Sequence, residues 1–477
     1  MKKLLTMLLL FLSSVLLAQT KYPEVNKEIS DGNFTKADSM IDKIIYQSSL
    51  SPSEIYELDF QKDRMNRIRL DFQKSAGDIL EYVRKYYPDA DENTLENWEK
   101  DGTLEYKIID GKKYYFNRAA SNLFRVNKEA KMQKQKVDGE DISSLTNFLS
   151  AYIPSAVDES NKTGKNLVKK EVLKLDYTIT VKPNAVPDGE IIRCWLPFPR
   201  EGHERQTDIK LDSINTSQYI IAGNNNLQRT VYMEKTAHKD EPTVFHEVFQ
   251  VTNYSELFHL NPDKILPYDK NSLLYKTYTS ERAPHIVFTD NIKSLSEKIV
   301  GDVTDPYLKA KRIWEWISKN VPWAGAREYS TIDDISEYCA ENGYGDCGIK
   351  SMLYITLCRY NGIPAKWQSG WMLHPNSVNL HDWTEIYFEG YGWVPVDPDF
   401  GLQNFTGTNE RYFYFGGTDA FHLIINDDFS KPLFPAKIYP RSETVDFQRG
   451  ELEWQGGNLY FDKWSYDMKV DYEPVNK

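Results

Sequence analysis

The sequence predicts an α+β protein in which an N-terminal helical domain and an antiparallel β-domain precede a core made of a helix packed on an antiparallel sheet. Three observations support this. Apolar residues recur at helical spacing over 37–45. From Leu175 onward they alternate as in strands. A glycine-rich turn then leads into a helix beginning near Cys347, followed by two β-prone runs over 381–397.

Composition is that of a globular chain. Its 477 residues are 40% hydrophobic and 27% charged, enough for about three domains. The net charge of −12 argues against nucleic acid as a partner. No acidic loop has calcium-ligand spacing, so we expect no metal and no other cofactor. Oligomeric state is not indicated.

Residues 1–19 have the layout of a secretory signal peptide. Lys2 and Lys3 precede an apolar run, and cleavage is expected near Ala18. Leu16 stands where a small residue is preferred, so an uncleaved membrane anchor is the alternative. We therefore expect a secreted or periplasmic protein.

Residues 20–126 are predicted to form a mainly helical domain with one hairpin. Ser51 to Glu54 read as a capping box that opens a helix through about Phe72. Asp110 and Gly111 lie between two β-prone runs over 104–116, a strong hairpin signal. This domain either binds a partner or substrate, or caps the core.

Three further segments complete the predicted organisation. Polar and charged runs predict a linker over 127–170. Alternation predicts an antiparallel β-domain over 171–284. Residues 285–477 are assigned to the core domain, with a C-terminal β extension through aromatic runs at 411–415 and 459–461.

Cys347 is predicted to be a nucleophile. The preceding glycines permit a sharp turn, and Asp346 is a plausible N-cap, which places Cys347 in the first helical turn. A thiol at the positive end of a helix with a cationic neighbour can form a thiolate at neutral pH. Cys194 and Cys358 are interpreted as core residues, and Cys339 is undecided. With Cys347 reserved, three cysteines remain, so a full disulfide framework is not implied.

His381 and Asp397 are the predicted partners of this thiol. A hairpin between their two β-prone runs would bring His381 at its start near Asp397 at its end. In such a triad the histidine accepts the thiol proton and the carboxylate orients the imidazole. The other histidines, including His246 in a strand-like run and His374 before a proline in a loop, are given no role.

Residues from about 285 to 400 resemble the transglutaminase-like superfamily of papain-type cysteine enzymes. The resemblance rests on five ordered pieces: the helix 305–317, Gly-Asp-Cys-Gly at 345–348, the helix end at 361–365, His-Asp-Trp at 381–383, and Gly-Trp-Val-Pro-Val-Asp-Pro at 392–398. It implies a papain-type core and assigns catalytic roles to Cys347, His381 and Asp397. Residues 174–198 are similar to the β-domain that precedes the core in many bacterial members. The first 165 residues or so are not covered.

Four tryptophans are candidates for roles around the site. Trp323, by its position after the preceding helix, is an oxyanion candidate beside the Cys347 N–H, and a core or groove-lining role is equally open. Trp367, Trp371 and Trp383 are candidates for the wall of a substrate groove, with an aromatic core as the alternative.

The predicted function is that of a secreted cysteine hydrolase, a protease or amidase. It would attack an amide carbonyl of a peptide or protein, form a thioester, and resolve it with water. Two alternatives are kept: an amine as acceptor, which gives protein-glutamine transamidation and cross-linking, and a catalytically inactive binding scaffold. The sequence does not identify the substrate.

Overall fold

The computed structural model describes residues 21–139 and 143–473. The predicted signal peptide at 1–19 lies outside the described residues. The chain forms two compact units. Unit 1 comprises residues up to 139 with the short segments 282–285 and 331–334, and unit 2 comprises the remainder.

Unit 1 is helical with one small sheet, as predicted for the N-terminal region. Its described helices are α2 (Pro23–Ser30), α3 (Phe34–Gln47), α4 (Pro52–Asp71), α5 (Ala76–Val83), α6 (Glu92–Lys100), α7 (Ala119–Val126) and α8 (Lys128–Asp138). Ser51 and Glu54 form the predicted capping box of α4. The sheet order is β1-β3-β2, from β1 (Phe72–Lys74), β2 (Tyr106–Ile109) and β3 (Lys112–Phe116). Asp110 and Gly111 both have positive φ, as the tight turn between β2 and β3 requires.

Among its described residues, unit 2 contains three antiparallel sheets. The first sheet, on which α14 packs, has the strand order β12-β11-β10-β14. The second has the order β13-β9-β4-β17, with β6 paired to β9, and the third has the order β16-β15-β5-β8-β7. The strands are β4 (Leu167–Val181), β5 (Ile191–Pro197), β6 (Gln206–Ile214), β7 (Tyr219–Ile221), β8 (Thr230–Thr236), β9 (Thr243–Leu257), β10 (Ala365–His374), β11 (Ser377–Phe388), β12 (Gly392–Val396), β13 (Gly417–Thr418), β14 (His422–Asn426), β15 (Glu451–Trp454), β16 (Gly457–Leu459) and β17 (Trp464–Glu473).

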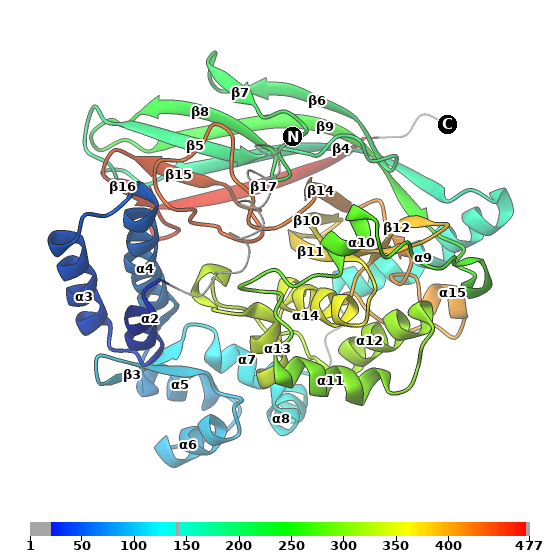
Figure 1. Ribbon diagram of the computed structural model, residues 1–477, viewed down its shortest axis with the longest axis horizontal. Coiled ribbons are helices and arrows are strands. Elements are labelled where there is room, and N and C mark those ends of the chain that lie inside the picture. The colour runs from blue at the N-terminus through cyan, green and yellow to red at the C-terminus, as the bar shows by residue number, and fades with distance from the viewer. Residues whose placement is uncertain (1–20, 140–142, 474–477) are drawn as a thin grey trace, which may run out of the picture. The chain divides into compact units, whose positions relative to one another are not determined.

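One helix, α14 (Cys347–Tyr360), positions the site. Every residue from Gly348 to Arg359 is buried, because α14 packs on β10 and β11 and is flanked by other helices (Figure 1). The remaining helices of unit 2 are α9 (Ser144–Thr163), α10 (Leu273–Tyr278), α11 (Asp290–Val300), α12 (Pro306–Asn320), α13 (Ile335–Asn342) and α15 (Thr408–Arg411). A helix buried on all sides holds its first turn in a fixed place, which suits a reactive residue there.

Helices occupy most of the segment for which the sequence predicted a linker, residues 127–170. That expectation is corrected: α8 covers Lys128–Asp138 and α9 covers Ser144–Thr163. The charged run of α8 is rich in strong helix formers, so a solvated helix and a linker share the same composition. Ser143 caps α9 through the Thr146 N–H, and Gly164 ends it in the left-handed conformation.

The C-terminal strands join sheets begun much earlier in the chain. β17 pairs with β4 from Trp464↔Val181 to Glu473↔Val172, and β15 pairs with β5. One apolar core cluster therefore draws on early strands, on β10 and on β14, including Tyr177, Trp371 and Leu423. The alternation of apolar and polar residues predicts that these strands exist, but it does not predict which distant strands pair with one another. Among the described residues, no helix has both the length and the apolar character needed to cross a membrane.

The carboxyl group of Glu247 provides a test of this core. Glu247 is 0% exposed on the face of β9 that also carries buried Phe245 and Phe249, and neither carboxyl oxygen has a hydrogen-bond partner among the described residues. Burial raises the pKa of Glu247 well above its usual value. The folded state therefore holds the proton while the unfolded chain releases it, so this group lowers stability as pH rises above the unfolded pKa.

We predict that Glu247→Gln raises the free energy of unfolding relative to the unmodified protein, by more at about pH 8 than at about pH 5. Urea unfolding at the two pH values measures this. Glu241→Gln, an exposed position shortly before β9, is the control. An equal effect of Glu247→Gln at both pH values contradicts the prediction.

Candidate functional site

The structure places Cys347 as the first residue of α14, as predicted. Asp346 is the N-cap, and its side chain accepts the Ile349 N–H at 3.1 Å. The turn before it is held by backbone hydrogen bonds from Gly345 to Pro322 and from Ala324 to Gly345. Cys347 is only partly buried, while the other three cysteines are buried and unpaired. Of the four cysteines, Cys347 is therefore the one that is not fully buried.

The hairpin of β11 and β12 brings the predicted partners together. Thr384 pairs with Val396, so Asp397 directly after β12 faces the first half of β11. His381 Nε2 lies 2.7 Å from Asp397 Oδ2. A ring nitrogen of His381 and Cys347 Sγ lie within 4.8 Å of each other. Since Nε2 is engaged with Asp397, Nδ1 is the nitrogen left to accept the thiol proton.

The carboxyl group of Asp397 receives four donors. Oδ1 accepts the backbone N–H groups of Asp399 at 2.8 Å and Phe400 at 2.9 Å. Oδ2 receives His381 and, at 3.2 Å, His422 Nε2. Burial alone would raise the pKa of Asp397, but His381 and His422 hold it well below its usual value. Asp397 is thus a carboxylate that acts only as an acceptor.

A second buried carboxylate, Asp419, lies behind the first. It is contacted by His422 Nδ1 at 2.9 Å, His374 Nε2 at 2.9 Å and the Tyr414 hydroxyl at 2.6 Å. His374 is the last residue of β10 and is buried, where the sequence predicted a loop. The site therefore extends beyond Cys347, His381 and Asp397. A continuous hydrogen-bonded network is formed by His381, Asp397, His422, Asp419, His374 and Tyr414.

Carboxyl groups surround the thiol of Cys347. Sγ lies 3.4 Å from Asp382 Oδ2, and the Tyr329 hydroxyl donates to Asp346 at 2.8 Å. Burial, then Asp382 and Asp346, raise the pKa of Cys347 well above its usual value. The lowered thiol pKa expected from the helix N-terminus is thus not what these surroundings favour. A thiolate here depends on transfer of the proton to His381.

Several residues of the site carry no local sequence signal. Gln448 donates from Nε2 to the His381 carbonyl at 2.6 Å and to Asp382 Oδ1 at 2.7 Å, from 67 residues away in the chain. Lys350, on α14, pairs with Asp399 at 2.8 Å. Asp382 lay inside a motif that the sequence analysis used, but its contact with the thiol depends on how α14 docks on β11.

The four tryptophans for which the sequence suggested roles differ in their surroundings. The backbone of Trp323 forms a bridge with Gly345, close to the nucleophile, so its oxyanion role stays a proposal. Trp367, Trp371 and Trp383 are 0%, 0% and 1% exposed. Their assignment to a groove wall is corrected, because buried rings cannot line a solvent-accessible groove. Trp383 instead stacks on the His381 ring, with centroids 5.8 Å apart.

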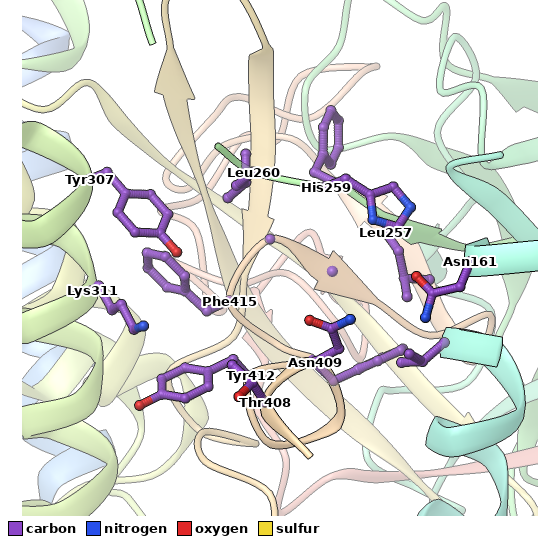
Figure 2. A pocket seen from close by; sticks show the side chains of 15 residues that line it. Asn161, Leu257, His259, Leu260, Tyr307, Lys311, Thr408, Asn409, Tyr412 and Phe415 are labelled. Carbon is purple, nitrogen blue, oxygen red and sulfur yellow. The ribbon is translucent and has the colours of Figure 1, made fainter. Parts of the chain in front are cut away.

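A pocket of about 270 Å³ lies elsewhere in unit 2 and is lined by residues that include Asn161, His259, Tyr307 and Lys311 (Figure 2). Neither the Cys347 thiol nor any of the imidazoles of His374, His381 and His422 contributes to it. Within the described chain, His374 Nε2, His381 Nε2 and both ring nitrogens of His422 are hydrogen-bonded to Asp397 or Asp419, and Asp399 is paired with Lys350. We therefore assign none of them as a metal ligand.

Comparison with known proteins shows which family the centre of the chain resembles. Residues 293–398 match the family model of the transglutaminase-like superfamily. An uncharacterized protein of Haemophilus influenzae is 26% identical over 239 residues, covering 43% of this chain and 62% of that protein. The uncharacterized protein YebA of Bacillus subtilis is 25% identical over 253 residues, covering 46% of this chain and 34% of YebA. The matches span less than two thirds of either relative.

Two solved structures are also similar. A candidate cysteine protease from Cytophaga hutchinsonii has a TM-score of 0.44 at 16% identity, covering 65% of this chain and 93% of that one. The periplasmic domain of TgpA from Pseudomonas aeruginosa has a TM-score of 0.27 at 12% identity, covering 47% and 87%.

Gly348, the second residue of α14, tests the packing of the site. A Cβ there would lie 2.2 Å from the Tyr329 hydroxyl and 2.7 Å from Asp382 Oδ2. We predict that Gly348→Ala lowers the melting temperature and slows alkylation of Cys347, because these side chains must move. Gly77→Ala in the first turn of α5 is the matched control, since its Cβ meets only Ser75 Oγ at 3.6 Å. The control should stabilise by ~0.5–1 kcal/mol. Equal effects of the two substitutions contradict the prediction.

Proposed function

From the membership of residues 293–398 in the transglutaminase-like superfamily, we propose that this protein is a cysteine hydrolase, a protease or amidase acting on amide bonds of peptides or proteins. One observation carries the proposal. Cys347, only partly buried at the start of α14, has a ring nitrogen of His381 within 4.8 Å of its sulfur, and His381 is held by Asp397 at 2.7 Å. We also propose export, from the composition of residues 1–19.

The proposed reaction uses these three side chains in two halves. The thiol proton passes to His381, and Cys347 Sγ attacks the amide carbonyl carbon. The negative charge moves to the carbonyl oxygen, for which the Cys347 N–H at the helix start is a donor. As the oxygen reforms the carbonyl, the C–N bond breaks and the imidazolium protonates the leaving amine. Water, deprotonated by His381, then attacks the thioester carbonyl carbon; the C–S bond breaks, the carboxylic acid is released, and the imidazolium returns its proton to Cys347.

The acidic surroundings of Cys347 set a condition on this scheme. Because Asp382 and Asp346 disfavour an isolated thiolate, the reactive state is the pair of thiolate and imidazolium, whose two titration midpoints belong to the pair. The role of Asp397 is to stabilise the charged imidazole and orient it.

We predict single-site alkylation at Cys347 by iodoacetamide, faster near neutral pH than for an ordinary thiol and slowed about tenfold or more in His381→Ala. Intact-mass analysis of the full chain against pH measures it. Cys347→Ala should abolish labelling, and His246→Gln, in β9 outside the network, is the control. Labelling no faster than that of a free cysteine, and insensitive to His381, favours an inactive binding scaffold.

Incubation with a glutamine-containing protein, with and without a fluorescent primary amine, distinguishes the two acceptors. Release of peptides or ammonia without amine incorporation supports hydrolysis. Covalent incorporation of the amine, absent in Cys347→Ala, supports transamidation instead.

Trp323→Phe tests the oxyanion proposal. If the indole N–H donates to the oxyanion, kcat falls by about tenfold or more with a smaller change in KM. The assay is turnover of whichever peptide the acceptor experiment identifies, with the melting temperature as a check on folding. An unchanged kcat removes Trp323 from the oxyanion site and leaves the Cys347 N–H as the donor.

A further inference from the structure

His422, which the sequence analysis gave no role, lies at the centre of the buried network. It begins β14 and is 0% exposed. Nδ1 lies 2.9 Å from Asp419 Oδ1, and Nε2 lies 3.2 Å from Asp397 Oδ2. Its ring centroid is 5.0 Å from that of His381. Each ring nitrogen of His422 thus faces a carboxylate oxygen.

Both carboxylates act as acceptors. Besides the two imidazoles, Asp397 accepts two backbone N–H groups. Besides His422, Asp419 accepts the Phe421 N–H at 2.8 Å, the Tyr414 hydroxyl and His374. Four donors on a buried carboxyl group favour its ionised form. A lone pair on either His422 nitrogen would face an oxygen lone pair, so both nitrogens must carry a proton.

Charge balance leads to the same state. Two carboxylates buried together need a cation to offset the cost of desolvation. His374 donates only from Nε2, and its Nδ1 has no hydrogen-bond partner among the described residues, which fits a neutral ring. With His422 charged and His374 neutral, Asp397, Asp419 and these two rings together carry one net negative charge; Arg205, which acts on Asp419 electrostatically but forms no hydrogen bond with it, is outside this sum. That charge is what His381 meets when it accepts the thiol proton.

We propose that His422 is a positioning residue: a permanent imidazolium that bridges Asp397 and Asp419, fixes Asp397 against His381, and shares its negative charge. Sharing limits how tightly Asp397 holds the proton on His381, so that the imidazolium can return it to a leaving amine. The consequence for turnover rests on the proposed function, whereas the charge of His422 does not.

The electrostatic surroundings agree with this assignment. Burial opposes the charged ring, but Asp419 and the hydrogen bond to Asp397 outweigh it and raise the pKa of His422 to about 9. The titratable groups that contact His422 or act on its two carboxylates are Asp397, Asp419, His374, His381, Tyr414, Tyr152 and Arg205.

Nuclear magnetic resonance of the full chain with ¹⁵N-labelled histidine tests the charge directly. At about pH 7.5 we expect a buried imidazole with both ring nitrogens protonated that is absent from His422→Gln, whichever state His381 adopts. Asp419→Asn, which keeps the shape but removes one anion, should lower the titration midpoint of that ring by about one pH unit or more. A singly protonated His422 at neutral pH overturns the proposal. If His422→Gln does not fold, the shift in Asp419→Asn identifies the signal.

The pH profile of Cys347 alkylation tests the effect on the site. Removing the positive charge of His422 in His422→Gln should move both titration midpoints of the Cys347–His381 pair to higher pH. The upper midpoint, at which His381 loses its proton, should move by about one unit or more, because the His381 ring lies next to that of His422. His246→Gln, whose partner Asp176 lies outside the network, is the matched control, and the melting temperature reports folding.

The outcomes separate the two proposals. Unshifted midpoints in a folded His422→Gln protein, or in Asp419→Asn if His422→Gln does not fold, overturn the positioning role. A Cys347 that reacts as an ordinary thiol in the unmodified protein overturns the hydrolase proposal, while the resonance experiment still decides the charge of His422.

Discussion

The carboxylate of Asp397 is the interaction on which the site depends. Its two oxygens collect donors from three parts of unit 2: the turn after β12, His381 on β11 and His422 on β14. A buried charge is tolerated only where it is fully hydrogen-bonded, so the three segments hold one another in place. Without this carboxylate, two imidazoles and two backbone N–H groups would lose their acceptor in an environment with little water.

The thiol of Cys347 lies between two opposite electrostatic environments. On one side Asp382 and Asp346 oppose a negative sulfur, and on the other the imidazole of His381 can take its proton. Neither side alone gives a reactive thiol at neutral pH. The arrangement therefore ties reactivity to the position of a single proton on His381, more than to the helix N-terminus.

Features encoded within a few residues could be predicted, and those made by distant pairing could not. The turn and N-cap before Cys347, and the hairpin that joins His381 to Asp397, use short-range rules of backbone conformation and strand pairing. His422 and Gln448 reach the site from other strands and loops, 25 and 67 residues from the groups they contact. No periodicity specifies those distances. The assignment of Trp367, Trp371 and Trp383 to a groove wall was wrong for a related reason, since a sequence shows aromatic character but not depth of burial.

Gly370 shows how the fold sets the spacing of the network. It pairs with His381 on one side of β10 and with Ile424 of β14 on the other. A Cβ at Gly370 would lie 1.9 Å from the Leu423 carbonyl oxygen, so only glycine lets β14 approach this closely. The register also shifts between Ser369 and Gly370, as a bulge does when it redirects a side chain. The glycine and the shift bring β14 against β10, and this places His422 beside His381. A residue without a side chain thereby determines which two imidazoles share one carboxylate.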